Sequence, residues 1–96
     1  MRRSQTLPVG DLLREYLSKY GLEQKFLEAK VMYSWPEVVG TAVAKKTKNL
    51  AIKNRVLFVY LESSVVKNHL GMIKNDLPAL LNEKAGFSVI DEVVLR

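Results

Sequence analysis

Few residues of this 96-residue chain are of the types that do acid–base, nucleophilic or metal chemistry. His69 is the single histidine, so no second imidazole can share a metal ion or a proton with it, and we interpret it as structural. Ser64 and Lys67 have the S-x-x-K spacing of serine acyl-enzymes, but neither an S-D-N nor a K-T-G segment accompanies them. We therefore interpret Ser64 as a residue at the start of a helix and Lys67 as a solvent-facing side chain.

The glycine pattern and the cysteine count exclude further classes of site. The five glycines form neither a G-x-G-x-x-G nor a G-x-x-x-x-G-K-S/T pattern, so the chain has no phosphate-binding glycine loop. The chain contains no cysteine, which excludes disulfides, thiolate zinc sites and iron–sulfur clusters. We therefore expect a binding module rather than an enzyme, with no catalytic residue, no cofactor, no metal and no small-molecule substrate.

Positive charge is the more informative feature of this sequence. Lys and Arg number 15 against 10 Asp and Glu, which gives a formal net charge of +5. The window from Val38 to Leu61 contains no carboxylate, and such a cationic window can neutralise nucleic-acid phosphates. The alternative is a solvated edge strand whose lysines oppose sheet-to-sheet aggregation. The predicted nucleic-acid-binding residues are Lys45, Lys46, Lys48, Lys53 and Arg55.

Helices are predicted on the N-terminal side of this window. Apolar residues at helical spacing predict a helix from Pro8 to Tyr20 and a second from about Leu22 to Ser34. Because the residue before a proline is pushed out of the α region, Trp35-Pro36 is expected to end the second helix. Pro36 would then open a short helix that carries Val43.

A β-hairpin is predicted within the window. Segments Leu50–Lys53 and Val56–Leu61 are rich in β-forming residues, and Asn54-Arg55 between them forms a short polar turn. Alternation gives the second strand two apolar faces, which indicates a central strand or an exposed aromatic face used for binding. We interpret Phe58 and Tyr60 as core residues rather than as residues that stack on bases.

The C-terminal part is predicted to contain helices and one more strand. Ser63-Ser64 offers an N-cap, a break is expected near Asn75-Asp76, and Gly86 ends the helical region before a strand over Ser88–Arg96. The predicted fold is therefore one α+β domain over residues 1–96, with residues 1–6 as a flexible arm. No apolar run approaches the roughly 18 residues of a membrane helix, and none of signal length follows the N-terminus, so we expect a cytoplasmic protein.

The order and spacing of several short motifs, from about Leu7 to Arg96, resemble the DciA family, also known as domain of unknown function 721. The matching segments are Trp35-Pro36-Glu37-Val38-Val39-Gly40, then Ala44 and Thr47, Leu57-Phe58-Val59, Ser63-Ser64, a helix with Leu70 and Ile73, and Ile90-Asp91-Glu92-Val93-Val94-Leu95-Arg96.

The resemblance implies a KH-like fold, in which helices pack on one face of a three-stranded sheet. Members of the family are understood as bacterial replication factors that associate with the replicative helicase, help to place it on DNA and bind DNA themselves. The resemblance therefore implies a non-enzymatic DNA-replication adaptor, with single-stranded or forked DNA and the replicative helicase as partners.

Three residues match the family pattern individually: Trp35, Gly40 and Thr47. Trp35 is expected to anchor the junction between helix and sheet, and Gly40 to permit close packing or a tight turn. The G-x-x-G loop that clamps the nucleic-acid backbone in KH domains is absent from this sequence. Two alternatives therefore stay open. One is a protein–protein module that uses an exposed apolar helix face and binds no nucleic acid, and the other is a KH-like RNA-binding protein.

Overall fold

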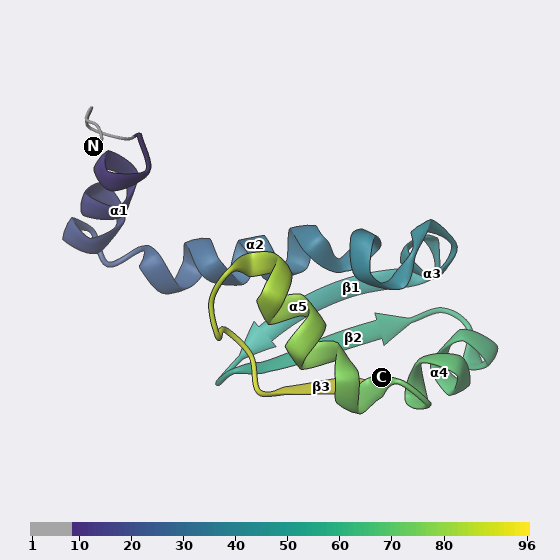
Figure 1. The fold of residues 1–96 in the computed structure, drawn as a ribbon. Helices are drawn as coiled ribbons and strands as arrows, with labels where there is room; N and C mark the ends of the chain where they lie inside the picture. The colour runs from purple at the N-terminus through teal and green to yellow at the C-terminus, as the bar shows by residue number, and fades with distance from the viewer. Residues whose placement is uncertain (1–8) are drawn as a thin grey trace.

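The computed structural model describes residues 9–96, and the side chains from residue 12 onward. The predicted flexible arm (residues 1–6) and the predicted first helical residue, Pro8, lie outside the described residues. Along the chain the elements are α1 (Val9–Lys19), α2 (Glu23–Val39), α3 (Thr41–Lys45), β1 (Thr47–Lys53), β2 (Val56–Leu61), α4 (Ser64–Gly71), the 3-10 turn η1 (Lys74–Asp76), α5 (Leu77–Ala85) and β3 (Glu92–Leu95) (Figure 1).

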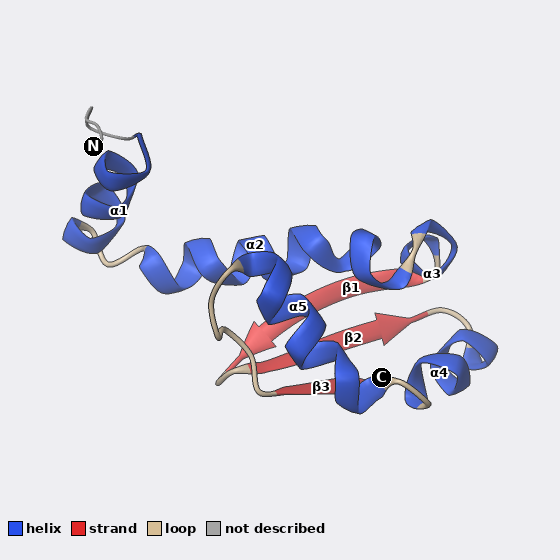
Figure 2. Ribbon diagram, in the orientation of Figure 1, coloured by secondary structure: helices blue, strands red, loops and turns tan. Residues whose placement is uncertain are grey.

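The three strands form one mixed sheet in the order β1-β2-β3. β1 pairs with β2 antiparallel, and β2 pairs with β3 in parallel. α2 and α5 lie on the same face of this sheet (Figure 2). The predicted α+β class and the three-stranded sheet with helices on one face are confirmed. The core lies between sheet and helices and contains Val31, Trp35, Leu57, Val59, Leu61, Leu70, Leu77, Leu81, Ala85, Val89, Ile90 and Val93. None of the described helices is long and apolar enough to cross a membrane.

The helix break predicted at Trp35-Pro36 is wrong, because α2 continues through Pro36 and ends at Val39. A proline removes one helical donor and crowds the preceding turn, but burial of Val31 and Trp35 holds this helix against the sheet and outweighs that cost. Gly40 ends the helix instead. Its φ is +92°, a value that side chains other than glycine rarely adopt, and nothing lies within 4 Å of where a Cβ would be. Gly40 therefore provides the tight turn into α3, which is the second of the two alternatives expected for it, and not close packing.

The predicted hairpin is confirmed. Asn54 and Arg55 both have positive φ, 52° and 66°, as a two-residue type I′ turn requires. Ser63 is the N-cap of α4, and its hydroxyl accepts a hydrogen bond from the Val66 N–H at 3.3 Å. The last strand is shorter than predicted and covers only Glu92–Leu95.

β2 has one covered and one uncovered face. Leu57, Val59 and Leu61 point to the helices and are buried. Phe58 is half-buried, Tyr60 is 36% exposed, and neither belongs to the core cluster. Our interpretation of Phe58 and Tyr60 as core residues is therefore wrong, because the helices cover only the opposite face of the sheet.

A short hydrogen-bond chain connects α2, α3 and β1. The indole Nε1 of Trp35, a residue that is 2% exposed, donates to the Thr47 hydroxyl at 3.0 Å. That hydroxyl in turn donates to the carbonyl of Val43 at 3.0 Å. Only a hydroxyl can both accept from the indole and donate to the carbonyl at this position. Two of the three family-motif residues are thus joined directly.

We predict that Thr47→Val lowers the free energy of unfolding by about 1–3 kcal/mol, because it leaves the buried indole N–H of Trp35 without an acceptor. Thr47→Ser keeps the hydroxyl and should recover most of that loss. Chemical denaturation followed by the fluorescence of Trp35, the single tryptophan, measures both variants. Equal stability of the Val and Ser variants would show that the hydrogen bonds contribute nothing.

Candidate nucleic-acid interface

The predicted lysines lie at the end of α3 and along β1, which is at the edge of the sheet. Lys45 ends α3, Lys46 follows it, Lys48 lies near the start of β1 and Lys53 ends the strand. All four side chains are exposed. A seven-residue strand is about 20 Å long, so Lys53 lies well apart from the other three. The structure therefore places the predicted lysines in a row along one edge rather than in one compact cluster.

These lysines take no part in the ion pairs of the described residues, which are Arg55–Asp91 and Lys84–Glu37. β1 is an edge strand, since it pairs with β2 alone. A β-bulge between Thr47 and Asn49 sets Lys48 out of the regular pairing. Among the described residues, Lys48 and Lys53 thus lie on a strand edge that no other strand covers, Lys45 and Lys46 come just before this strand, and none of the four forms an ion pair.

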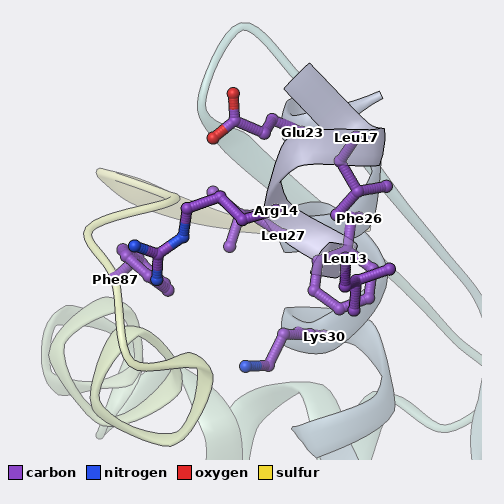
Figure 3. A pocket seen from close by; sticks show the side chains of 8 residues that line it. All are labelled: Leu13, Arg14, Leu17, Glu23, Phe26, Leu27, Lys30 and Phe87. Carbon is purple, nitrogen blue, oxygen red and sulfur yellow. The ribbon is translucent and has the colours of Figure 1, made fainter. Parts of the chain in front are cut away.

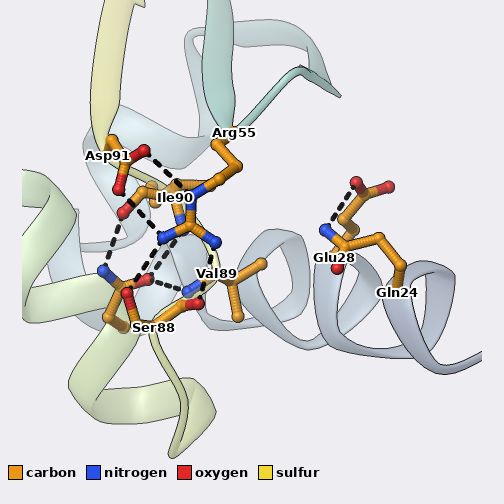
Figure 4. Close-up of polar contacts among 8 residues, drawn as sticks. Gln24, Glu28, Arg55, Ser88, Val89, Ile90 and Asp91 are labelled. Carbon is orange, nitrogen blue, oxygen red and sulfur yellow. Dashed lines mark hydrogen bonds and ion pairs between the residues drawn. The ribbon is translucent and has the colours of Figure 1, made fainter.

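The side chain of Arg55, the fifth predicted residue, forms hydrogen bonds to other residues of the protein. Its Nε and Nη2 donate to the two carboxylate oxygens of Asp91, each at 2.9 Å. Nη1 also donates to the Ser88 carbonyl at 3.1 Å, and Nη2 to the Ser88 hydroxyl at 2.9 Å (Figure 4). The guanidinium therefore has its charge compensated and its orientation fixed, unlike the four lysines. Arg55 connects the hairpin turn to the segment that leads into β3.

The segment before β3, residues 88–91, also forms hydrogen bonds with Asn82 of α5. The side-chain oxygen of Asn82 accepts hydrogen bonds from the backbone N–H groups of Val89 and Ile90, at 2.9 and 3.0 Å. Its amide nitrogen donates to the Ile90 carbonyl at 2.8 Å. The backbone N–H of Asp91 donates to the Arg55 carbonyl at 2.8 Å. The side chains of Asn82 and Arg55, together with this one backbone bond, thus hold residues 88–91, where the sequence predicted a strand.

The ion pair shifts the titration of both partners. Hydrogen bonding to Arg55 lowers the pKa of Asp91 below its ordinary 3.8, and hydrogen bonding to Asp91 raises the pKa of Arg55. A carboxylate with a depressed folded-state pKa stabilises the fold above its unfolded pKa, and this stabilisation is lost as pH falls through the folded pKa. Since the Asp91 side chain is 66% exposed, solvent weakens the pair.

We predict that Asp91→Asn lowers the melting temperature at neutral pH, and that the difference from the wild-type protein shrinks as pH falls below 3.8. Thermal melts followed by circular dichroism across this range measure the effect. Glu83→Gln is the matched control, because it removes an exposed carboxylate of α5 that has no ion pair among the described residues. A difference that stays constant down to strongly acidic pH would contradict the role of the charge.

The uncovered face of the sheet borders the lysine row. Cross-strand pairing sets Phe58 beside Ala51 of β1 and Val94 of β3, and sets Tyr60 beside Asn49. The Arg96 guanidinium lies over the Phe58 ring, 5.2 Å from its centroid. The alternation of Val56, Phe58 and Tyr60 with the core residues of β2 was the sequence signal for this face. We name it the uncovered sheet face, composed of Asn49, Ala51, Lys53, Val56, Phe58, Tyr60, Glu92, Val94 and Arg96.

A second exposed surface lies at the other end of the molecule. α1 packs against the start of α2, and of its described side chains only Leu17 is buried (Figure 1). Between the two helices and Phe87 is a hollow of about 350 Å³ (Figure 3). We call it the α1–α2 hollow; its lining residues are Leu13, Arg14, Leu17, Glu23, Phe26, Leu27, Lys30 and Phe87.

The residues with catalytic or metal-binding potential are not brought together. His69, Ser64 and Lys67 are all exposed on α4, and Ser63 rather than Ser64 caps that helix. Within the described part of the chain, no group of three His, Asp or Glu side chains could hold a metal ion. The arrangement offers cationic, aromatic and apolar surfaces, which suit binding.

Comparison with known proteins agrees with the motif order. The chain matches the family described as "Dna[CI] antecedent, DciA" over residues 8–95. A UPF0232 protein of Corynebacterium glutamicum (strain R) is 26% identical over 85 residues, which are 88% of this chain and 48% of that protein. A UPF0232 protein of Mycobacterium ulcerans (strain Agy99) is 29% identical over 83 residues, 86% of this chain and 44% of that protein.

The chain thus spans about half the length of these relatives. No solved structure matches it, so the KH-like fold that the resemblance implies stays a prediction. The family match, from residue 8 to residue 95, covers the sheet, the lysine row and all of the described helices. The chain therefore belongs to the DciA family.

Proposed function

We propose that this protein is a non-enzymatic DNA-replication adaptor that binds DNA phosphates through Lys45, Lys46, Lys48 and Lys53 and associates with the replicative helicase. Membership of the DciA family supports the replication role. The observation that carries the DNA contact is the row of four exposed lysines, without an ion pair among the described residues, that runs from the end of α3 along edge strand β1. We accordingly propose a cytoplasmic location.

Contacts of this kind have a characteristic dependence on salt. Lysine is a point charge that binds phosphate oxygens without reading bases, so the lysine row would give affinity but little sequence preference. Each neutralised phosphate of a single strand contributes about 0.7 to the slope of log affinity against log salt. The four lysines would therefore give a slope of at most about 3. Arg55 is left out of this count because Asp91 pairs with it.

We predict that replacing Lys45, Lys46 and Lys48 together by Gln weakens DNA binding and lowers the salt slope by about 2. Fluorescence anisotropy with a labelled single strand and a labelled fork, at several salt concentrations, measures both quantities. The control replaces Lys19, Lys25 and Lys67, which are exposed on other elements, and removes the same charge from the net +5. If both triple variants lose affinity equally, net charge rather than the lysine row explains binding.

The α1–α2 hollow supports association with a protein partner. Its lining is mainly apolar, and Leu13, Phe26 and Phe87 are 40%, 37% and 49% exposed around it. Exposed apolar surface of this kind, rimmed by charged side chains, is typical of a protein-binding site. The hollow equally suits a protein–protein module that binds no nucleic acid. The anisotropy measurement of DNA binding distinguishes such a module from a DNA-binding adaptor.

We predict that Leu13→Asp weakens binding of the replicative helicase from the same organism at least tenfold, because it places a carboxylate in an apolar contact. Val65→Asp, at a residue of α4 that is 76% exposed, is the control and should bind like the wild-type protein. Isothermal titration calorimetry with the purified helicase measures both. Unchanged binding by the Leu13 variant would place the helicase contact elsewhere.

A further inference from the structure

We propose that the uncovered sheet face is a base-stacking surface for a single-stranded nucleic acid, on which Phe58 and Tyr60 each receive one base. This inference rests on the proposed nucleic-acid binding and deepens it, because it adds a second kind of contact and a preference for single strands. The lysine row alone would hold any nucleic acid by its phosphates.

The first step is that the two aromatic rings lie on the same face of the sheet, the face that α2 and α5 leave uncovered. Phe58 and Tyr60 are two residues apart on β2, so they point to the same side, about 7 Å from each other. Neither ring packs against the core, and the helices α2 and α5 lie on the opposite face of the sheet (Figure 2). Aromatic side chains on an open sheet surface are able to stack with unpaired bases.

The second step is the chemistry around the rings. The small side chain of Ala51 and the side chain of Val94 flank Phe58, which is half-buried. The Arg96 guanidinium contacts this ring in the free protein. Because exposed cation–π contacts are weaker than base–aromatic stacking, a base can displace the guanidinium, which then is free to meet a phosphate.

The third step is electrostatic continuity. Lys53 and Arg96 belong to this face, whereas Glu92 is its single carboxylate and lies opposite Val56, at the hairpin end of the sheet. Lys48 directly precedes Asn49, the partner of Tyr60, at the other end of β1, and Lys45 and Lys46 lie in the connection that leads into this end of the strand. A strand that stacks on Tyr60 and Phe58 therefore keeps its backbone beside the lysine row. This charge complementarity favours a polyanion over a protein as the occupant.

The geometry also sets a preference for single strands. Successive bases in a duplex are about 3.4 Å apart and have their faces covered by their neighbours. The two rings, about 7 Å apart, suit bases that are drawn apart and unstacked. A duplex could contact the lysine row but not the rings.

The experiment compares wild-type protein with the double variant Phe58→Leu, Tyr60→Leu. Leucine removes the rings but keeps an apolar side chain, so a protein partner held by apolar contact would tolerate the change, whereas base stacking would not. The control is Tyr33→Leu, which removes a ring that is 88% exposed on α2. Binding of labelled oligothymidylate, oligouridylate of equal length and a blunt duplex is measured by fluorescence anisotropy.

The double variant should bind the oligothymidylate at least tenfold more weakly than the wild-type protein, while its duplex affinity stays unchanged. Tyr33→Leu should leave both affinities unchanged. A similar loss with oligouridylate supports the stacking surface, and the tighter of the two wild-type affinities then identifies DNA or RNA as the ligand. Thermal melts confirm that each variant is folded. The single variant Tyr60→Leu, at an exposed position, gives the same test with a smaller loss of single-strand affinity.

Two outcomes overturn this inference, and a third overturns the proposed function itself. Single-strand affinity that is equal in the wild-type protein and the double variant means that the rings do not stack with bases. Loss of helicase binding in the double variant, with oligonucleotide binding intact, means that a protein covers this face. Absence of binding to every oligonucleotide at low salt removes the nucleic-acid function and the stacking surface together.

Discussion

The hydrogen bond from the Trp35 indole to the Thr47 hydroxyl is the contact on which the placement of the other parts depends. A tryptophan that is 2% exposed cannot leave its N–H without a partner at low cost, and Thr47, at the start of β1, supplies one. The bond requires the end of α2 to lie over the start of β1. Gly40 makes this possible, because its positive φ lets the chain turn directly from α2 into α3. Lys45 and Lys46 lie in the connection that closes this contact.

The turn of the β1–β2 hairpin is held by an ion pair. Arg55 and Asp91, 36 residues apart in the chain, form a two-pronged ion pair that links the β1–β2 turn to the segment before β3. With Asn82 holding the same segment from α5, β3 is directed into parallel pairing with β2. The polar side chains that hold the sheet in place therefore lie at its two ends, with Trp35 and Thr47 at the start of β1 and Arg55 and Asp91 at the hairpin turn. The lysine row and the uncovered sheet face take no part in these contacts.

The proposed binding surfaces are separated by the length of α2. The α1–α2 hollow lies at the start of this 17-residue helix, and Lys45, Lys46 and Lys48 of the lysine row follow its end, about 25 Å away along the helix. A helicase bound at the hollow would leave the lysine row and the uncovered sheet face free to hold a nucleic-acid strand. This separation is what an adaptor between a protein and a nucleic acid needs, and it depends on α2 remaining continuous through Pro36.

The sequence by itself determined the features that depend on neighbouring residues. Asn54-Arg55 specified the turn, Ser63 the helix start and Gly86 a helix end, because each acts through backbone conformation or a hydrogen bond within a few residues. Only the tertiary structure decided that α2 passes through Pro36, that Arg55 pairs with Asp91, and that Phe58 and Tyr60 lie on the uncovered face. Alternation along β2 showed that two apolar faces exist but not which one the helices would cover. That choice depends on contacts between segments far apart in the chain, whose burial energies outweigh local preferences.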